Sequence, residues 1–131
     1  MKIYLDTSAL AKLLVPETES QALREYLGEI SQDTLFTAAL TRTELVRVAR
    51  RINTAAVTAA RSILSGLTKI SLTAGLLDDA ANLDPPLLRS LDAIHLAAAR
   101  RAGTELRAVI TYDARMAEAA ESLALPVLAP C

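Results

Sequence analysis

The sequence has little of several residue types, and each shortage excludes a class of protein. Its only cysteine is Cys131, which excludes a disulfide framework and a cysteine-based metal site. No apolar run approaches the roughly 20 residues that a membrane-spanning helix needs. Asp6 and Lys12 interrupt the stretch in which a signal peptide would be apolar. We therefore expect a cytoplasmic protein that does not associate with membranes.

Aliphatic residues make up most of the hydrophobic part of the sequence. The chain is 52% hydrophobic and 22% charged, with 3% aromatic residues and no tryptophan, which excludes an intrinsically disordered protein. Its 131 residues fit one domain of ordinary size, which we place at residues 1–131. A core of alanine, leucine, valine and isoleucine suits helices that pack closely on a sheet.

Charge is distributed unevenly along the chain. The net charge of −1 argues against indiscriminate binding to nucleic acid. However, residues 42–61 contain five arginines and one acid, whereas residues 17–33 contain five acids and one arginine. The basic character is therefore local, and a local basic surface still permits binding to a polyanion.

Short apolar segments alternate with segments of helical period. We expect strands at 2–5, 35–38, 68–72, 107–111 and 127–128, and helices at 8–15, 17–30, 40–52, 55–67, 73–83, 88–102 and 113–123. Strands joined by helical crossovers predict an α/β fold with a central, mostly parallel sheet of about five short strands, covered on both faces. In such sheets the active cleft lies beyond the carboxyl ends of the strands.

Four acids occupy positions where such a cleft would form. Asp6 directly follows the first strand, and Asp113 closely follows the fourth. The second and third acids, Glu44 and Asp92, lie early in helices among apolar neighbours. An isolated carboxylate there would be costly to ionise, and clustered carboxylates would raise one another's pKa values. A divalent cation would relieve both problems, and oxygen-only ligands favour Mg²⁺ or Mn²⁺.

Each acid also has a purely structural explanation. Asp6 and Asp113 each precede a helix and could be N-caps. Thr41 and Glu44 match the spacing of a capping box. Ser90 could cap the helix that carries the third acid in its first turn. Spacing along the sequence does not decide whether the four acids converge.

Four segments, in order, resemble the PIN-domain nucleases, and among these the VapC toxins of type II toxin–antitoxin systems. The stretch LDTSALAKL at 5–13 resembles the family's opening strand and first acid, and TEL at 43–45 its second acid. LDAIHLAAA at 91–99 resembles the helix of the third acid, and TYD at 111–113 the fourth acid. The resemblance extends over nearly the whole chain.

This resemblance implies a PIN-like three-layer α/β/α fold and a metal-dependent endoribonuclease, a hydrolase of phosphodiester bonds that uses Mg²⁺ or, in its place, Mn²⁺. It assigns catalysis and metal binding to Asp6, Glu44, Asp92 and Asp113. It assigns supporting hydrogen bonds to Ser8 and Thr111. One departure is Met116, which stands where many members of the family carry a further acid.

The same resemblance implies partners. We expect an RNA substrate, a homodimer, and a VapB-like antitoxin that blocks the groove within a hetero-oligomer, with contacts on the apolar faces of 17–30 and 40–67. Arg47, Arg50 and Arg51 become candidate RNA contacts, although such a patch is by default a solvated face. We interpret His95 as a packed or hydrogen-bonded residue of an apolar helix and not as a catalytic base.

Two other functions stay open from the residues themselves. One is a different acid-pocket hydrolase, such as a haloacid-dehalogenase-like phosphatase, or a receiver domain. Such phosphatases carry a second Asp two residues after the first, where Ser8 stands, and no lysine follows the strand at 107–111 as a receiver requires. The other is a non-enzymatic partner-binding module whose acids are all caps. Metal binding and RNA cleavage would separate these functions.

Overall fold

The computed structural model of the protein describes every residue from Met1 to Cys131. Its five strands are β1 (Lys2–Leu5), β2 (Thr34–Ala38), β3 (Thr68–Ile70), β4 (Leu106–Ile110) and β5 (Val127–Leu128). Its seven helices are α1 (Thr7–Leu14), α2 (Ser20–Glu29), α3 (Thr41–Arg50), α4 (Thr54–Ser65), α5 (Ala74–Ala81), α6 (Ser90–Arg100) and α7 (Ala114–Ser122). A single 3₁₀ turn, Gly103–Glu105, precedes β4.

The five strands form one sheet in the order β3-β2-β1-β4-β5, and every neighbouring pair is parallel. Ile3 of the central strand β1 lies opposite Leu35 on one side and Ala108 on the other. The chain adds strands first on one side of β1 and then on the other. The strand order therefore reverses between β1 and β4, and this reversal is where parallel sheets form a crevice.

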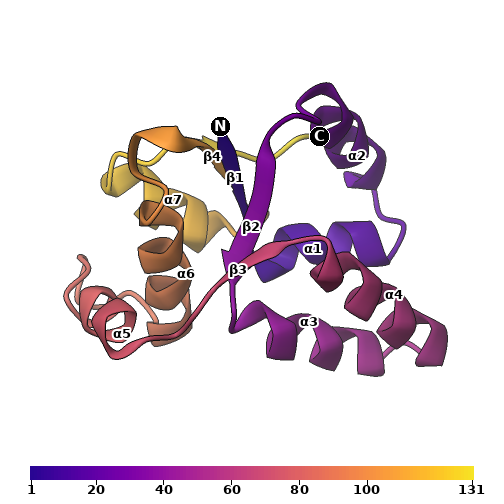
Figure 1. Cartoon of the computed structure of the whole chain (residues 1–131), viewed down its shortest axis with the longest axis horizontal. Coiled ribbons are helices and arrows are strands. Elements are labelled where there is room, and N and C mark those ends of the chain that lie inside the picture. The colour runs from indigo at the N-terminus through magenta and orange to yellow at the C-terminus, as the bar shows by residue number, and fades with distance from the viewer.

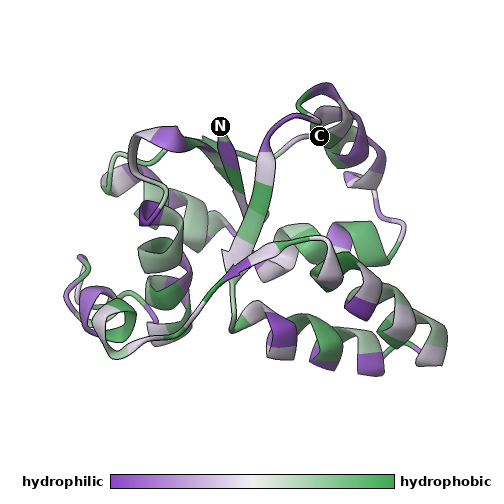
Figure 2. Ribbon diagram, in the orientation of Figure 1, coloured by the Kyte–Doolittle hydropathy of each residue, from purple (hydrophilic) through white to green (hydrophobic).

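Helices cover both faces of the sheet, which confirms the expected three layers (Figure 1). Side chains alternate along β1, so Ile3 and Leu5 join a core with α1, α2, α3 and α4. Tyr4 points to the other face and joins a core with α5, α6 and α7. The hydrophobic residues of the helices accordingly face the sheet, and hydrophilic residues lie outside (Figure 2).

The two cores consist largely of alanine and leucine. On α6, Ala97, Ala98 and Ala99 are all buried, and small side chains at this position let the helix lie close to the sheet. Every buried side-chain nitrogen and oxygen has a hydrogen-bond partner. No helix has both the length and the apolarity required to cross a membrane.

Helix and strand ends differ slightly from those expected from the sequence. Helix α2 begins at Ser20 and not at Glu17, because the Ser20 hydroxyl accepts a hydrogen bond from the Glu17 amide and closes a turn there. Strand β3 ends at Ile70, since its partner β2 ends at Ala38. Beyond that point Leu72 is 38% exposed, so the prediction of a strand extending to Leu72 is wrong.

Candidate active site

A hollow of about 350 Å³ opens at the carboxyl edge of the sheet, where β1 and β4 end side by side. The two strand ends are joined directly, since the Asp6 amide donates to the Ile110 carbonyl at 3.3 Å. The residues that line the hollow are Asp6, Thr7, Ser8, Glu44, Arg89, Ser90, Leu91, Asp92, Asp113 and Met116. All four acids singled out in the sequence are therefore brought together, from four different elements or their ends.

Asp6 lies at the floor of this hollow, with 3% of its surface exposed. Its Oδ1 accepts hydrogen bonds from the Ser8 hydroxyl at 2.6 Å and the Ala9 amide at 2.9 Å. Its Oδ2 accepts one from the Thr111 hydroxyl at 2.5 Å. Burial raises the pKa of Asp6 above its ordinary value, and these three hydrogen bonds only partly oppose the rise.

Ser8 and Thr111 also hold the end of β4 against the end of β1. The Ser8 hydroxyl accepts a hydrogen bond from the Tyr112 amide at 2.9 Å. The Thr111 hydroxyl accepts one from the Asp113 amide at 3.1 Å. The two residues that the resemblance assigns to supporting hydrogen bonds thus link the first acid to the segment that carries the fourth.

Arg89 bridges the third and fourth acids. Its Nε lies 3.0 Å from Asp92 Oδ2, and its terminal nitrogen lies 3.3 Å from Asp113 Oδ2. Asp92 is buried in the first turn of α6, Asp113 is half-buried, and the Arg89 side chain is 58% exposed. The positive charge of the Arg89 guanidinium therefore lies between the carboxylates of Asp92 and Asp113. The sequence alone offers one signal for this contact, since Arg89 stands three residues before Asp92, a spacing that allows an ion pair.

Glu44 enters the hollow from α3. Its Oε1 accepts hydrogen bonds from the Thr7 hydroxyl and from His95 Nε2, both at 2.7 Å. Burial acts to raise its pKa, but the hydrogen bonds from His95 and Thr7 outweigh burial, so the pKa of Glu44 lies below its ordinary value. The expectation that mutual repulsion would raise the acids' pKa values is therefore wrong for Glu44, because its neighbours are hydrogen-bond donors.

Capping explains two of the acids and not the others. Asp6 caps α1 and Asp113 caps α7, as their positions before helices indicate. The capping-box interpretation of Glu44 is wrong, because α3 begins after Leu40 without a side-chain cap and Thr41 instead hydrogen-bonds to Thr37 at 2.7 Å. Ser90 is not a cap either, since Arg89 occupies that position of α6. Glu44 and Asp92 therefore take no part in capping, although each lies in the first turn of its helix, where the helix dipole favours an anion.

The side chains of the hollow suit a divalent cation in chemistry, although they are not gathered around one point. No group of three or more Asp, Glu, His or Cys side chains lies close enough together to hold an ion. The donors are nevertheless all oxygens, the set that Mg²⁺ and Mn²⁺ prefer. The Arg89 guanidinium between Asp92 and Asp113 marks a position where these carboxylates accept a positive charge. Met116, the noted departure from the family's acids, lines the hollow and contributes no carboxylate.

A second hollow, of about 680 Å³, lies between α3 and α4 and is lined by positive charge. Its residues include no acid, and the cations that line it are Arg42, Arg47, Arg50, Arg61 and Lys69. Of the three arginines singled out in the sequence, Arg47 and Arg50 line this hollow, and the exposed Arg51 does not. Arg61 belongs to the basic segment 42–61 of the sequence. Only the fold shows that it lines the same hollow as Arg47 and Arg50.

The apolar faces of α2, α3 and α4, where partner contacts were expected, are occupied largely by the protein's own core. On these helices, Leu23, Leu45 and Ala49 are fully buried. Several large apolar side chains are exposed elsewhere. They are Leu72, Leu77, Leu87, Leu91 and Leu128, of which Leu91 borders the acid hollow.

The sequence matches the PIN domain family over residues 3–122. It is 45% identical to ribonuclease VapC35 of Mycobacterium tuberculosis over 130 residues, which cover 98% of this chain and 96% of that protein. It is 44% identical to ribonuclease VapC46 of the same organism over 128 residues, which cover 98% of this chain and 97% of that protein.

Solved structures show the same fold at lower sequence identity. VapC20 of Mycobacterium tuberculosis, described as a toxin that cleaves the sarcin–ricin loop, superposes with a TM-score of 0.75 at 20% identity and covers 98% of this chain and 99% of that one. VapBC2 from Rickettsia felis, bound to a DNA fragment from its promoter, superposes with a TM-score of 0.74 at 13% identity and full coverage of both chains.

Proposed function

This chain belongs to the PIN domain family and is a nuclease of the VapC toxin type, and from that premise we propose that it cleaves RNA with Mg²⁺ at the acid hollow. Its relatives at 44–45% identity are named ribonucleases. We also propose that residues 1–131 form a single domain. Both cores share one sheet, and the family match already covers residues 3–122.

This proposal rests on the four acids that line one hollow at the switch point of the sheet. Asp6 and Asp113 follow β1 and β4, whereas Glu44 and Asp92 come from helices on opposite faces of the sheet. Two of these carboxylates contact Arg89 and a third is held by His95 and Thr7, so each has a defined position. No capping requirement accounts for Glu44 or Asp92 in this hollow.

In this proposal the metal ligands are Asp6, Asp92 and Asp113, with Glu44 bound directly or through water. When bound, the ion lowers the pKa of a water molecule and neutralises charge on the scissile phosphate. Ser8 and Thr111 keep the Asp6 carboxylate fixed, so that its orientation does not depend on the ion. Burial of Asp6 favours a compensating positive charge, since its ionised form is costly in the folded protein.

Glu44 has the properties of a group that orients the attacking water. Its lowered pKa keeps it ionised at neutral pH. Its Oε1 already accepts two hydrogen bonds from the protein, whereas its Oε2 has no protein partner. One oxygen therefore anchors the side chain and the other is available to accept a proton from water or substrate.

RNA would reach the acids along positively charged surface. The arginines between α3 and α4 form no ion pairs within the chain, so they are free to contact phosphates. Lys69 is less available, because its ammonium already donates to the carbonyls of Leu64 and Leu67. Arg47 and Arg50 lie on the same helix as Glu44, which places this basic hollow beside the acid hollow. Arg51, the residue directly after the end of this helix, is proposed as an outer contact.

We further propose a VapB-like antitoxin as partner and a homodimer as the toxin's own assembly. Support comes from the VapC relatives and from the VapBC2 structure, which has the same fold. The exposed Leu91 borders the acid hollow, and the exposed Leu87 lies in an adjoining hollow that shares Arg89 and Asp92 with it. Both leucines offer apolar surface where a blocking segment would lie. The apolar faces of α2 and α3 offer less, because the core already covers them.

Mapping RNA cleavage ends tests the activity and the site together. Total RNA treated with the wild-type protein and Mg²⁺ should show defined new ends, and the Asp6→Asn variant should produce none. Equal cleavage by both proteins would refute the site. Hydrolysis of a simple phosphate monoester without RNA cleavage would favour the phosphatase alternative, and no divalent-ion binding at all would favour a non-enzymatic module.

A further inference from the structure

A line of hydrogen bonds connects the core to the acid hollow. Tyr4 Oη lies 2.6 Å from His95 Nδ1, and His95 Nε2 lies 2.7 Å from Glu44 Oε1. Tyr4 is fully buried and His95 is 3% exposed, whereas Glu44 reaches the hollow. Three side chains from β1, α6 and α3 thus form one continuous contact from the centre of the sheet to a proposed catalytic group.

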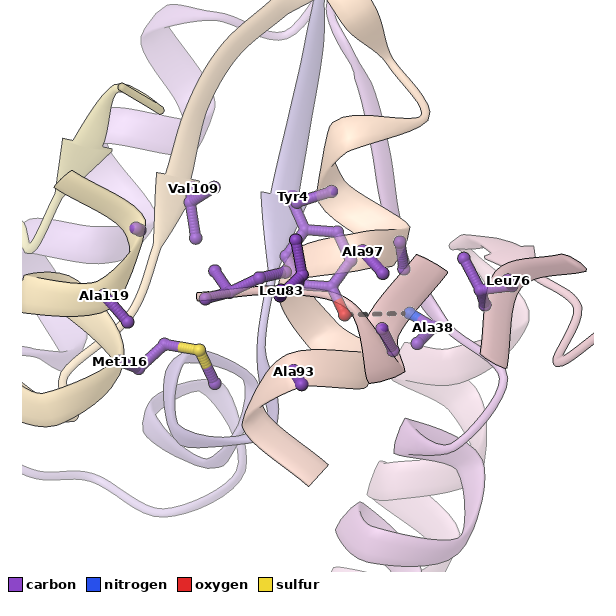
Figure 3. Packing of buried hydrophobic residues seen from close by; sticks show 14 of the residues in the cluster. Tyr4, Ala38, Leu76, Leu83, Ala93, Ala97, Val109, Met116 and Ala119 are labelled. Carbon is purple, nitrogen blue, oxygen red and sulfur yellow. Dashed lines mark hydrogen bonds between the residues drawn. The ribbon is translucent and has the colours of Figure 1, made fainter. Parts of the chain in front are cut away.

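The direction of these hydrogen bonds follows from the environment of Tyr4. Its hydroxyl oxygen accepts a hydrogen bond from the Ala38 amide at 3.2 Å, drawn as the dashed line in Figure 3. The hydroxyl proton is therefore donated elsewhere, and His95 Nδ1 is the acceptor in reach. With Nδ1 as acceptor, the proton of a neutral His95 resides on Nε2, and Nε2 donates it to Glu44.

The anchor of this line is rigid. Tyr4 lies in the central strand, and its ring packs edge to face against Phe36 at 5.2 Å and against the His95 ring at 5.9 Å between centroids. Ala38 is itself held in the sheet by its pairing with Ile70 of β3. The His95 ring therefore has a fixed position and a fixed tautomer, which a surface histidine would lack.

We propose that His95, oriented by Tyr4, is a positioning residue that holds Glu44 Oε1 and so leaves Oε2 available to the reacting groups. This inference rests on the proposed function of the acid hollow. Thr7 donates to the same oxygen, so both protein donors act on Oε1 and none on Oε2. A histidine that served only packing would not need to direct its Nε2 proton at Glu44 Oε1, the same oxygen that Thr7 binds.

The first test reads the tautomer directly in the metal-free protein. His95 is the only histidine, so protein labelled with ¹⁵N-histidine gives a nitrogen spectrum from this ring alone. We expect a pyridine-type shift for Nδ1 and a pyrrole-type shift for Nε2 at neutral pH. In Tyr4→Phe, Nε2 should keep its pyrrole-type shift, because Glu44 still accepts from it, while Nδ1 should shift as it loses the hydrogen bond from the tyrosine hydroxyl. A proton on Nδ1 in the wild type would overturn the proposal, whatever the enzymatic activity.

The second test separates positioning from packing by kinetics. His95→Leu removes the donor to Glu44, whereas His95→Gln retains an N–H close to the position of Nε2. We expect His95→Leu to lower kcat about 10- to 100-fold, the usual cost of losing an outer-sphere partner, with little change in KM. His95→Gln should recover most of kcat. Equal loss in both variants, with equal melting temperatures, would contradict a positioning role.

Tyr4→Phe is the corresponding variant at the other end of the line. It should lower kcat with little change in KM, and Tyr26→Phe, which removes a hydroxyl from α2 on the opposite face of the sheet, serves as its matched control. If His95→Leu does not fold, His95→Gln and Tyr4→Phe still decide the outcome. Loss of kcat in Tyr26→Phe equal to that in Tyr4→Phe would overturn the proposal. Inactive wild-type protein would instead refute the proposed function and leave the nitrogen spectrum as an independent result.

Discussion

Asp6 combines two roles that are often treated as alternatives. Its Oδ1 caps α1 through the Ala9 amide, and the same carboxylate lies at the floor of the acid hollow. A cap needs only an acceptor oxygen, whereas a cation site needs the negative charge. The two roles can therefore be separated experimentally, because asparagine keeps the oxygen and loses the charge.

We predict that Asp6→Asn stabilises the metal-free protein at neutral pH. Burial raises the folded-state pKa of Asp6 above 3.8, so the folded protein binds the proton more tightly than the unfolded chain does. The free energy of unfolding of the wild type therefore falls as pH rises above about 3.8, until the folded-state pKa is passed. Melting curves in EDTA should show a gap in favour of Asp6→Asn at pH 7 that closes as pH approaches 4.

Asp6→Ala is the matched comparison for this prediction. It removes the charge and the cap together, so it should be about 1 kcal/mol less stable than Asp6→Asn. Glu44 contributes the opposite pH dependence, since its lowered pKa gives stability that is lost as pH falls, but it is present in all three proteins and cancels. A gap between wild type and Asp6→Asn that does not change with pH would contradict the assignment of burial as the cause.

Arg89 competes with a divalent cation for two carboxylates. Its guanidinium contacts Asp92 and Asp113, so an ion that binds them must displace it. We predict that Arg89→Ala binds Mn²⁺ a few-fold more tightly than the wild type, because the ion no longer has to displace an exposed guanidinium. Calorimetric titration measures this directly. Weaker Mn²⁺ binding in Arg89→Ala would show that Arg89 orders the site and does not compete for it.

At the scale of elements, α3 presents three different faces. Leu45 and Ala49 are buried against the sheet, Glu44 enters the acid hollow, and Arg47 and Arg50 line the basic hollow with α4. This arrangement follows from the helical period. Leu45 and Ala49 are four residues apart and share the side that faces the sheet, while Glu44, Arg47 and Arg50 follow one another at intervals of three around the rest of the helix. One helix thereby carries a catalytic candidate and its neighbouring phosphate contacts.

We predict that the α3–α4 hollow determines the salt dependence of RNA binding. Changing Arg47, Arg50 and Arg61 to glutamine should weaken binding and reduce the slope of log K against log salt by up to about 2, at roughly 0.7 for each lost contact with a single strand. Binding is measured in the Asp6→Asn background, so that RNA is not cleaved during the titration.

The control for this triple variant changes charge by the same amount at other sites. Lys2, Arg24 and Arg101 lie outside both hollows, where they contact Glu105, the Leu13 carbonyl and Asp79. Their replacement by glutamine should leave the slope nearly unchanged. Equal slopes for the two triple variants would mean that RNA responds to net charge alone, and the α3–α4 hollow would no longer be a proposed RNA contact.

At the scale of the whole molecule, the fold does not depend on an ion. Each face of the sheet has its own hydrophobic core, and no buried polar side chain lacks a partner. The acid hollow lies at one edge of the sheet, and Met116 is the only core residue that lines it. Metal binding should therefore add to stability without being required for folding.

We predict that Mg²⁺ or Mn²⁺ raises the melting temperature and that EDTA removes the gain without unfolding the protein. At a free ion concentration one hundred times Kd, the gain in free energy of unfolding is about 2.7 kcal/mol. Asp92→Asn should gain less, because it lacks one proposed ligand. A single cooperative transition would support one domain over residues 1–131. Unfolding on chelation would contradict a purely catalytic role for the ion.

The sequence by itself determined the elements and the sheet. Apolar segments such as Lys2–Leu5 have the length and period of buried strands, and each strand and helix expected from the sequence is present. Parallel strands joined by helices place strand ends at one edge, so the positions of Asp6 and Asp113 after β1 and β4 already predicted that both acids lie at this edge. That the two acids lie side by side follows from the strand order, in which β1 and β4 are neighbours. These inferences depend only on local pattern and chain connectivity.

Only the tertiary structure decided which side chains touch. Tyr4 and His95 are 91 residues apart, and His95 and Glu44 are 51 apart, yet the three form one line of hydrogen bonds. Arg89 reaches Asp113 across 24 residues in the same way. Such contacts depend on how each helix is rotated and seated on the sheet, which is set by the packing of both cores. A sequence pattern predicts which residues share one face of a helix, but it does not predict which side chains that face contacts.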